Sequence, residues 1–238
     1  MDKELTTVEH LTELRHVVIS SSIIFIVSFI VMICFIQQIT PFLTKGEMLT
    51  MLGPLEVVRF YTGVAGSLSL GVSAPFIGFQ LWRFIKPALT TTESKAALRY
   101  IPAMFFSFLA GTSFGFFVVF PFVYQFLIHL GELHFHMLIT TKEYFSFLLM
   151  STIPLGFLFE VPFALMFLTV IGIVTPNDLK KTRKYGYLLL AIVSALITPP
   201  DFVSQIIVLI PLMLLYEIGL YCSKHIYAKH MRHESQAN

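Results

Sequence analysis

The sequence has few charged residues, and it has only two cysteines. Asp, Glu, Lys and Arg make up 13% of its 238 residues, against roughly 25% in an ordinary soluble domain. Cys34 and Cys222 lie near opposite ends of the first and last apolar segments, which excludes a disulfide framework and favours two inert thiols. A net charge of +2 is too small to indicate nucleic-acid binding. Hydrophobic residues reach 56% and the mean hydropathy is +0.79, so the sequence predicts an integral membrane protein.

Motifs for catalysis and for metal binding are also missing. The one Gly-x-Ser-x-Gly match, at 111–115, lies inside a long apolar run and not in the strand-to-helix turn that a nucleophile elbow needs. The sequence contains no phosphate-binding loop and no His-Glu-x-x-His helix. His134 and His136 follow Glu132 at a spacing that supplies too few ligands for a metal. The sequence therefore predicts neither an enzyme nor a protein with a metal or another cofactor.

Long apolar runs predict six membrane-spanning helices in one all-α membrane domain, residues 1–238. The runs lie at about 17–36, 61–85, 101–130, 144–174, 186–197 and 202–220. About 20 helical residues are needed to cross the hydrocarbon core. We therefore expect short fifth and sixth helices beside a long fourth one, which Pro154 and Pro162 could bend. Such a set of helices would form a concave bundle.

The basic residues predict the orientation of the chain. On a six-span topology, thirteen of the sixteen Lys and Arg residues lie on the side of the two termini. Only Lys45, Arg59 and Lys142 lie on the other side. Positive charge accumulates on the cytoplasmic side of membrane proteins, so both termini are expected to be cytoplasmic.

Glu160 is a lone carboxylate within a long apolar segment. An ionised group at that depth costs at least about 2.5 kcal/mol, so it either serves as hydrogen-bonded glue between helices or lines a cavity. Asp201 and Gln205 favour the cavity, because at i and i+4 they share a face at the outer end of the last segment. Asp201 could equally be an N-cap residue.

Two further carboxylates lie on the cytoplasmic side. Glu13 lies on one face of a predicted N-terminal helix together with Glu9 and His16, and that face could be an ordinary solvated surface. Glu93 follows Pro87 in the first cytoplasmic connection and could be part of a capping box. The functional alternative is a pair, Glu13 and Glu93, for a cationic ligand. Two carboxylates would suit two arginines, because a guanidinium binds a carboxylate through two parallel hydrogen bonds.

Four motifs occur in order along the chain. They are His10-Leu11-Thr12-Glu13-Leu14-Arg15, Phe84-Ile85-Lys86-Pro87-Ala88-Leu89 with Glu93, Phe159-Glu160-Val161-Pro162, and Thr198-Pro199-Pro200-Asp201 with Ser204-Gln205. With these motifs the whole chain resembles TatC, the multispanning receptor subunit of the twin-arginine protein translocase. Pro41 in the first outer loop also resembles a family position.

The resemblance implies a cupped-hand fold of six helices in the cytoplasmic membrane. It implies binding of twin-arginine signal peptides of folded proteins by Glu13 and Glu93, with Arg15 and Phe84 shaping the same surface. Glu160 would meet the deeper part of the signal peptide or a single-span partner of the TatA type. The receptor complex would contain more than one copy of the chain, and export would use the proton-motive force.

A transporter is the alternative function from a different class. An isolated carboxylate within a membrane segment is typical of proton-coupled transport. On this hypothesis, Glu160 would carry protons during uptake of a small solute.

Overall fold

The computed structural model describes residues 7–44, 49–85, 91–133, 136–170, 172–198 and 201–237, and Pro87 lies outside this described part. Side chains are described for most of these residues, but not for 7–11, 91–101 or 229–237, nor at positions 75, 81, 82, 85 and 170. All regular structure in the described ranges is helical, apart from one isolated bridge between Thr50 and Thr140. The predicted all-α class is confirmed for this part of the chain.

The helices group into two compact units. The first contains Met1–Phe105 and Ile139–Phe145, and the second contains Phe106–Leu138 and Ser146–Asn238. The division falls inside two helices, α3 (Thr91–Phe114) and α5 (Thr141–Leu158). Each of these two helices therefore contributes residues to both units.

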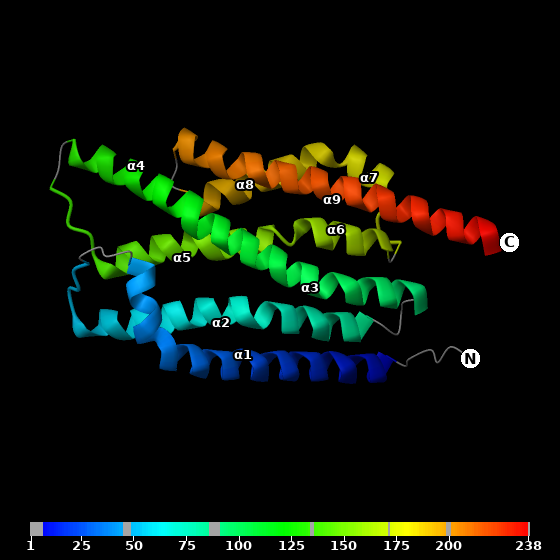
Figure 1. Ribbon diagram of the computed structural model, residues 1–238, viewed down its shortest axis with the longest axis horizontal. Helices are drawn as coiled ribbons and strands as arrows, with labels where there is room; N and C mark the ends of the chain where they lie inside the picture. Colours follow the sequence, from blue (N-terminus) through cyan, green and yellow to red (C-terminus); the bar gives the residue numbers. More distant parts are fainter. Residues whose placement is uncertain are drawn as a thin grey trace. The chain divides into compact units, whose positions relative to one another are not determined.

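In the first unit, α1 (Thr7–Thr44) packs along α2 (Pro54–Ile85) (Figure 1). The last part of α1 turns away from the main helix axis (Figure 1), and Pro41 lies in this part. A proline inside a helix removes one backbone donor and clashes with the preceding turn, which accounts for a bend here. Cε2 of Phe29 on α1 lies 3.8 Å from the position that a Cβ on Gly66 of α2 would take, an ordinary van der Waals distance, so the phenyl ring of Phe29 packs against α2 here.

A tyrosine ties the end of α1 to the start of α5. Tyr144 is 1% exposed, and its hydroxyl donates to the carbonyl oxygens of Leu43 at 3.0 Å and Thr44 at 3.4 Å. These carbonyls belong to the last turn of α1, where helical partners are missing. The backbone amide of Thr141 also donates to the carbonyl of Thr50 at 2.9 Å. The first turn of α5 therefore contacts both the end of α1 and Thr50, which precedes α2.

The second unit holds the remaining helices. They are the rest of α3, the π-helix η2 (Gly115–Val119), α4 (Phe120–Glu132), the rest of α5, α6 (Val161–Val170), α7 (Pro176–Lys181), α8 (Arg183–Ile197) and α9 (Phe202–Ala237). Its core combines residues from η2, α4, α5, α8 and α9. The core residues are Val119, Val123, Leu155, Leu190, Val208, Leu212 and Tyr216. A short basic connection, α7, begins with a capping box in which Thr175 and Asp178 bond reciprocally, and the hydrogen bonds from Thr175 lower the pKa of Asp178.

The prediction of a short last helix is wrong. Helix α9 has 36 residues, and the stretch Phe202–Ala228 alone is long and apolar enough to cross a membrane. The predicted run 202–220 starts where α9 starts, but the helix continues to Ala237, and the polar residues Ser204 and Gln205 lie near its beginning. Both fit within the helix, since the backbone amide of Ser204 bonds to Asp201 and the side chain of Gln205 donates to the carbonyl of Ala191. By contrast, α8 has 15 residues, which at about 1.5 Å each span about 22 Å.

Four stretches in the described part of the chain are long and apolar enough to span a bilayer. They are Thr12–Thr44, Pro102–Glu132, Thr141–Thr169 and Phe202–Ala228. Their outward faces carry large apolar side chains, for example Ile30 at 58% and Leu214 at 59% exposure. Water would not favour so much exposed apolar surface, so the chain is a multi-pass membrane protein.

Candidate functional site

A pocket in the first unit lies where one face of α1 meets one face of α2. It is lined by Glu13, His16, Val17, Ser20, Gln80, Arg83 and Phe84. The residues from α1 follow a spacing of i, i+3, i+4 and i+7, and those from α2 follow i, i+3 and i+4, so each set shares one helical face. The cavity has a volume of about 230 Å³, below the roughly 300–1,000 Å³ typical of small-molecule sites. It is therefore sized for a side chain rather than for a larger metabolite.

Glu13 is the acidic group of this pocket. It is half-buried, and its Oε2 atom is shielded from solvent without accepting a hydrogen bond from any described residue. A buried carboxylate oxygen without a donor is costly. A guanidinium or ammonium group that entered the pocket would supply that donor, so the geometry fits a cationic side chain.

The structure brings only some of the predicted peptide-binding residues into this pocket. Glu13 and Phe84 line it together. Arg15 is exposed and does not line it, because a residue two positions from Glu13 lies on another face of the helix. Glu93 belongs to α3, but its side chain lies outside the described residues, as does the whole of Pro87.

Sequence reasoning missed Gln80 and Arg83. Both lie near the end of α2 and share a face with Phe84. The i, i+3, i+4 spacing that relates them was present in the sequence. What was missing was the knowledge that this face packs beside Glu13, and that depends on how α1 and α2 pair.

Glu160, in the second unit, lies in a break between two helices. α5 ends at Leu158 and α6 begins at Val161, so Glu160 is in the turn between them. Pro162, which lacks an amide hydrogen, explains why α5 cannot continue here. The Glu160 side chain is half-buried. Its Oε2 atom has no partner among the described residues.

Helix α3 holds the break at Glu160 in place. The hydroxyl of Ser107 donates to the carbonyl of Phe159 at 2.7 Å, which fixes the residue before Glu160. Gly111 lies so close to this segment that an added Cβ would be 2.6 Å from the carbonyl oxygen of Leu155 and 2.7 Å from Cγ of Phe159. The position of Glu160 is therefore determined by packing and not only by the chain around it.

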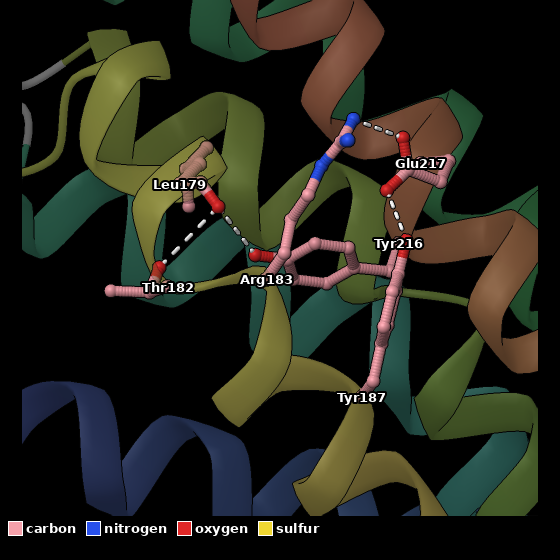
Figure 2. Close-up of polar contacts among 6 residues, drawn as sticks. All are labelled: Leu179, Thr182, Arg183, Tyr187, Tyr216 and Glu217. Carbon is pink, nitrogen blue, oxygen red and sulfur yellow. Dashed lines mark hydrogen bonds and ion pairs between the residues drawn. The ribbon is translucent and has the colours of Figure 1, made fainter.

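A second carboxylate, Glu217 on α9, is fully engaged. Arg183 Nη2 lies 2.5 Å from its Oε2 atom and the Tyr187 hydroxyl donates to Oε1 at 2.5 Å. Figure 2 shows both side chains reaching Glu217, and they come from successive turns of α8. Nearby, the Tyr216 hydroxyl donates to the carbonyl of Leu179 at 3.0 Å (Figure 2). Glu217 therefore joins α8 to α9, whereas Glu160 keeps an oxygen that no described group uses.

Asp201 and Gln205 have structural partners. Asp201 caps α9, because its Oδ1 atom accepts from the backbone amide of Ser204 at 2.7 Å. Its Oδ2 atom is buried without a described partner. The carbonyl of Gln205 accepts from the hydroxyl of Ser194 at 3.0 Å, so Gln205 links α8 to α9. The capping alternative for Asp201 is confirmed.

Comparisons with known proteins agree on one family. The family model described as "Sec-independent protein translocase protein (TatC)" matches residues 9–211. The Sec-independent protein translocase protein TatCd of Bacillus subtilis (strain 168) is 45% identical over 240 residues, which cover 100% of this chain and 99% of that protein. TatCy of the same organism is 39% identical over 235 residues, covering 95% of this chain and 91% of that protein.

Solved structures give the same result. A crystal structure of the twin arginine translocase receptor TatC has a TM-score of 0.79 and 31% sequence identity, and the match covers 92% of this chain and 99% of that one. A crystal structure of the receptor in DDM has a TM-score of 0.81 and 32% identity, with 91% and 100% covered. The family model and the relatives each extend over most of the sequence, and so this chain belongs to the TatC family of Sec-independent protein translocase proteins.

Proposed function

We propose that this chain is the receptor subunit of a twin-arginine translocase and that its Glu13 pocket binds an arginine of the signal peptide. The single observation that carries the site is the buried Oε2 atom of Glu13, which faces a side-chain-sized cavity and has no described donor. An arginine would satisfy it through a charge-assisted hydrogen bond. Phe84 forms part of the same pocket. Glu93 would receive the second arginine and Arg15 would contribute to the surrounding surface.

Loss of both carboxylates should weaken peptide binding. In Glu13→Gln plus Glu93→Gln, we expect the affinity for an Arg-Arg signal peptide to fall at least about tenfold, because each charge-assisted hydrogen bond is worth about 1.5–3 kcal/mol. Titration of a fluorescent peptide into the purified full-length protein measures this. Glu56→Gln serves as the control, since Glu56 is a carboxylate in the first turn of α2 and does not line the pocket. Equal affinity of the wild-type protein and the double variant would refute the assignment.

We further propose a single domain of six membrane-spanning helices, in the cytoplasmic membrane and with both termini in the cytoplasm. The excess of basic residues on one side supports this orientation. α2 and α8 would supply the two spans beyond the four long apolar stretches. Tilting or local thinning of the bilayer would accommodate the short α8.

Glu160 is the proposed contact for a single-span partner of the TatA type, with Asp201 and Gln205 on the same concave surface. A polar side chain on a partner helix would bond to the free Oε2 atom of Glu160, since unpaired polar groups in lipid are unfavourable. Several copies of the chain would assemble with this partner, and export of folded proteins would use the proton-motive force. The family assignment does not support the alternative of a proton-coupled solute transporter.

Photo-crosslinking can test this contact. A photoreactive residue in place of Glu160 should give crosslinks to a small membrane protein or to the signal peptide in native membranes. The same residue at Phe157, which is exposed in the preceding turn, is the matched control. Equal yields from the two positions would argue against a specific role of Glu160.

A further inference from the structure

The Glu13 pocket contains a cation of its own. Arg83 lies in the last turn of α2 and lines the same cavity as Glu13. The two side chains form no ion pair within 4.0 Å: the one that the described residues contain joins Arg183 to Glu217. Arg83 therefore does not neutralise Glu13 by direct contact, and it leaves the carboxylate open to a ligand.

The fixed charges of the pocket limit what can enter it. Glu13 carries one negative charge and Arg83 one positive charge, so the lining has a formal charge of zero when histidine is counted as neutral. A first guanidinium would pair with Glu13. A second guanidinium in the same cavity would find no second carboxylate and would lie near Arg83, where like charges repel. The volume of about 230 Å³ also favours one side chain over two.

We infer that Arg83 is a specificity-determining residue that admits one arginine of the pair to the Glu13 pocket and keeps the other outside it. This inference rests on the proposed function, since it concerns the same signal peptide. Arg83 would thereby set the register of the peptide: one arginine lies against Glu13, and its neighbour is directed away from α2. The polar side chains of Ser20 and Gln80 in the same lining suit the hydrogen-bonding groups of an extended peptide backbone.

The test isolates the Glu13 pocket in a Glu93→Gln background. Affinities of the full-length protein are measured for three synthetic signal peptides with Arg-Arg, Arg-Gln or Gln-Arg at the paired position. With Arg83 present, we expect Arg-Arg to bind within about twofold of the better single-arginine peptide. In Arg83→Gln, the affinity for Arg-Arg should rise about three- to tenfold, a larger factor than for either single-arginine peptide, because Arg-Arg brings two positive charges near Arg83 and the other peptides bring one.

Two controls and the salt dependence separate this effect from a general change of charge. Arg83→Lys, in the same Glu93→Gln background, keeps the positive charge and should show the same preference among the three peptides as the protein with Arg83. Arg59→Gln removes an exposed cation at the other end of α2 and should leave the peptide preference unchanged. The gain in Arg83→Gln should shrink at high salt, where exposed charges are screened.

Two outcomes would contradict the inference about Arg83, and they differ in what they say about the proposed function. An unchanged or weaker affinity for Arg-Arg in Arg83→Gln would overturn the role of Arg83 and leave the proposed function intact. If the unsubstituted protein fails to bind Arg-Arg peptides at all, the proposed function itself is wrong, and the inference about Arg83 is wrong with it.

Discussion

Replacing Gly111 with valine should destabilise the protein strongly, because it would force α3 away from α5. The first added carbon alone would lie 2.6 Å from the carbonyl oxygen of Leu155 and 2.8 Å from Cβ of Phe159. The carbonyl is backbone and cannot rotate away, so the two helices would have to separate. Overpacking of this kind costs about 1–3 kcal/mol, and the two further methyl groups of valine place the expected loss at about 3 kcal/mol. For a chain of this length, that corresponds to a fall in melting temperature of roughly 6–12 °C.

Thermal unfolding in detergent, followed by circular dichroism, measures this loss. Gly63→Val is the matched control, because Gly63 lies within α2 and a Cβ there meets nothing within 4 Å. Gly63→Val should change the stability by no more than about 1 kcal/mol, which is the range of helix propensities. If both valine variants melt at the same temperature, the close contact between α3 and α5 is not what Gly111 provides.

This contact also shows where prediction from the sequence ends. The all-helical membrane class could be predicted, because a run of about 20 apolar residues is itself the signal for a membrane helix. The extent of α9 could not, since the helix continues beyond the apolar run, from 220 to Ala237, through residues that carry no apolar signal. The π-helix η2 likewise contains Gly115, where an added Cβ would lie 2.8 Å from Cα of Thr152 on α5. No local pattern contains such a contact.

Some residues of the candidate site could likewise be predicted from the sequence, and others could not. Glu13 could be predicted because an acidic residue among basic ones at the cytoplasmic side is unusual, and because the motif around it resembles a known family. Arg83 could not be singled out, since one of many basic residues carries no special signal until α1 and α2 are placed together. Glu217 was missed for the corresponding reason: its partner Arg183 is 34 residues away and on a different helix.

Glu217→Gln should cost about 2 kcal/mol of stability, although it keeps the size of the side chain. It leaves the guanidinium of Arg183 without its anion, and removing one partner of a buried pair costs about 3–5 kcal/mol. Arg183 and Glu217 are 38% and 36% exposed, which reduces that figure. Arg183→Gln should have a similar effect, because Glu217 would then keep only the hydrogen bond from Tyr187. Melting temperatures of the two single variants in the same detergent measure both losses.

The double variant Arg183→Gln plus Glu217→Gln decides whether the pair acts as a unit. The double variant should lose less stability than the sum of the losses in the two single variants, by about 1 kcal/mol or more, since neither charge is then left without its partner. Glu160→Gln provides the contrast: with no described cationic partner, Glu160 should lose little or no stability on neutralisation while its crosslinks to the partner decline. Strictly additive losses at Arg183 and Glu217 would mean that their contact contributes nothing. A large loss in Glu160→Gln would mean that Glu160, like Glu217, belongs to the framework of the fold and not to a surface that recognises a partner.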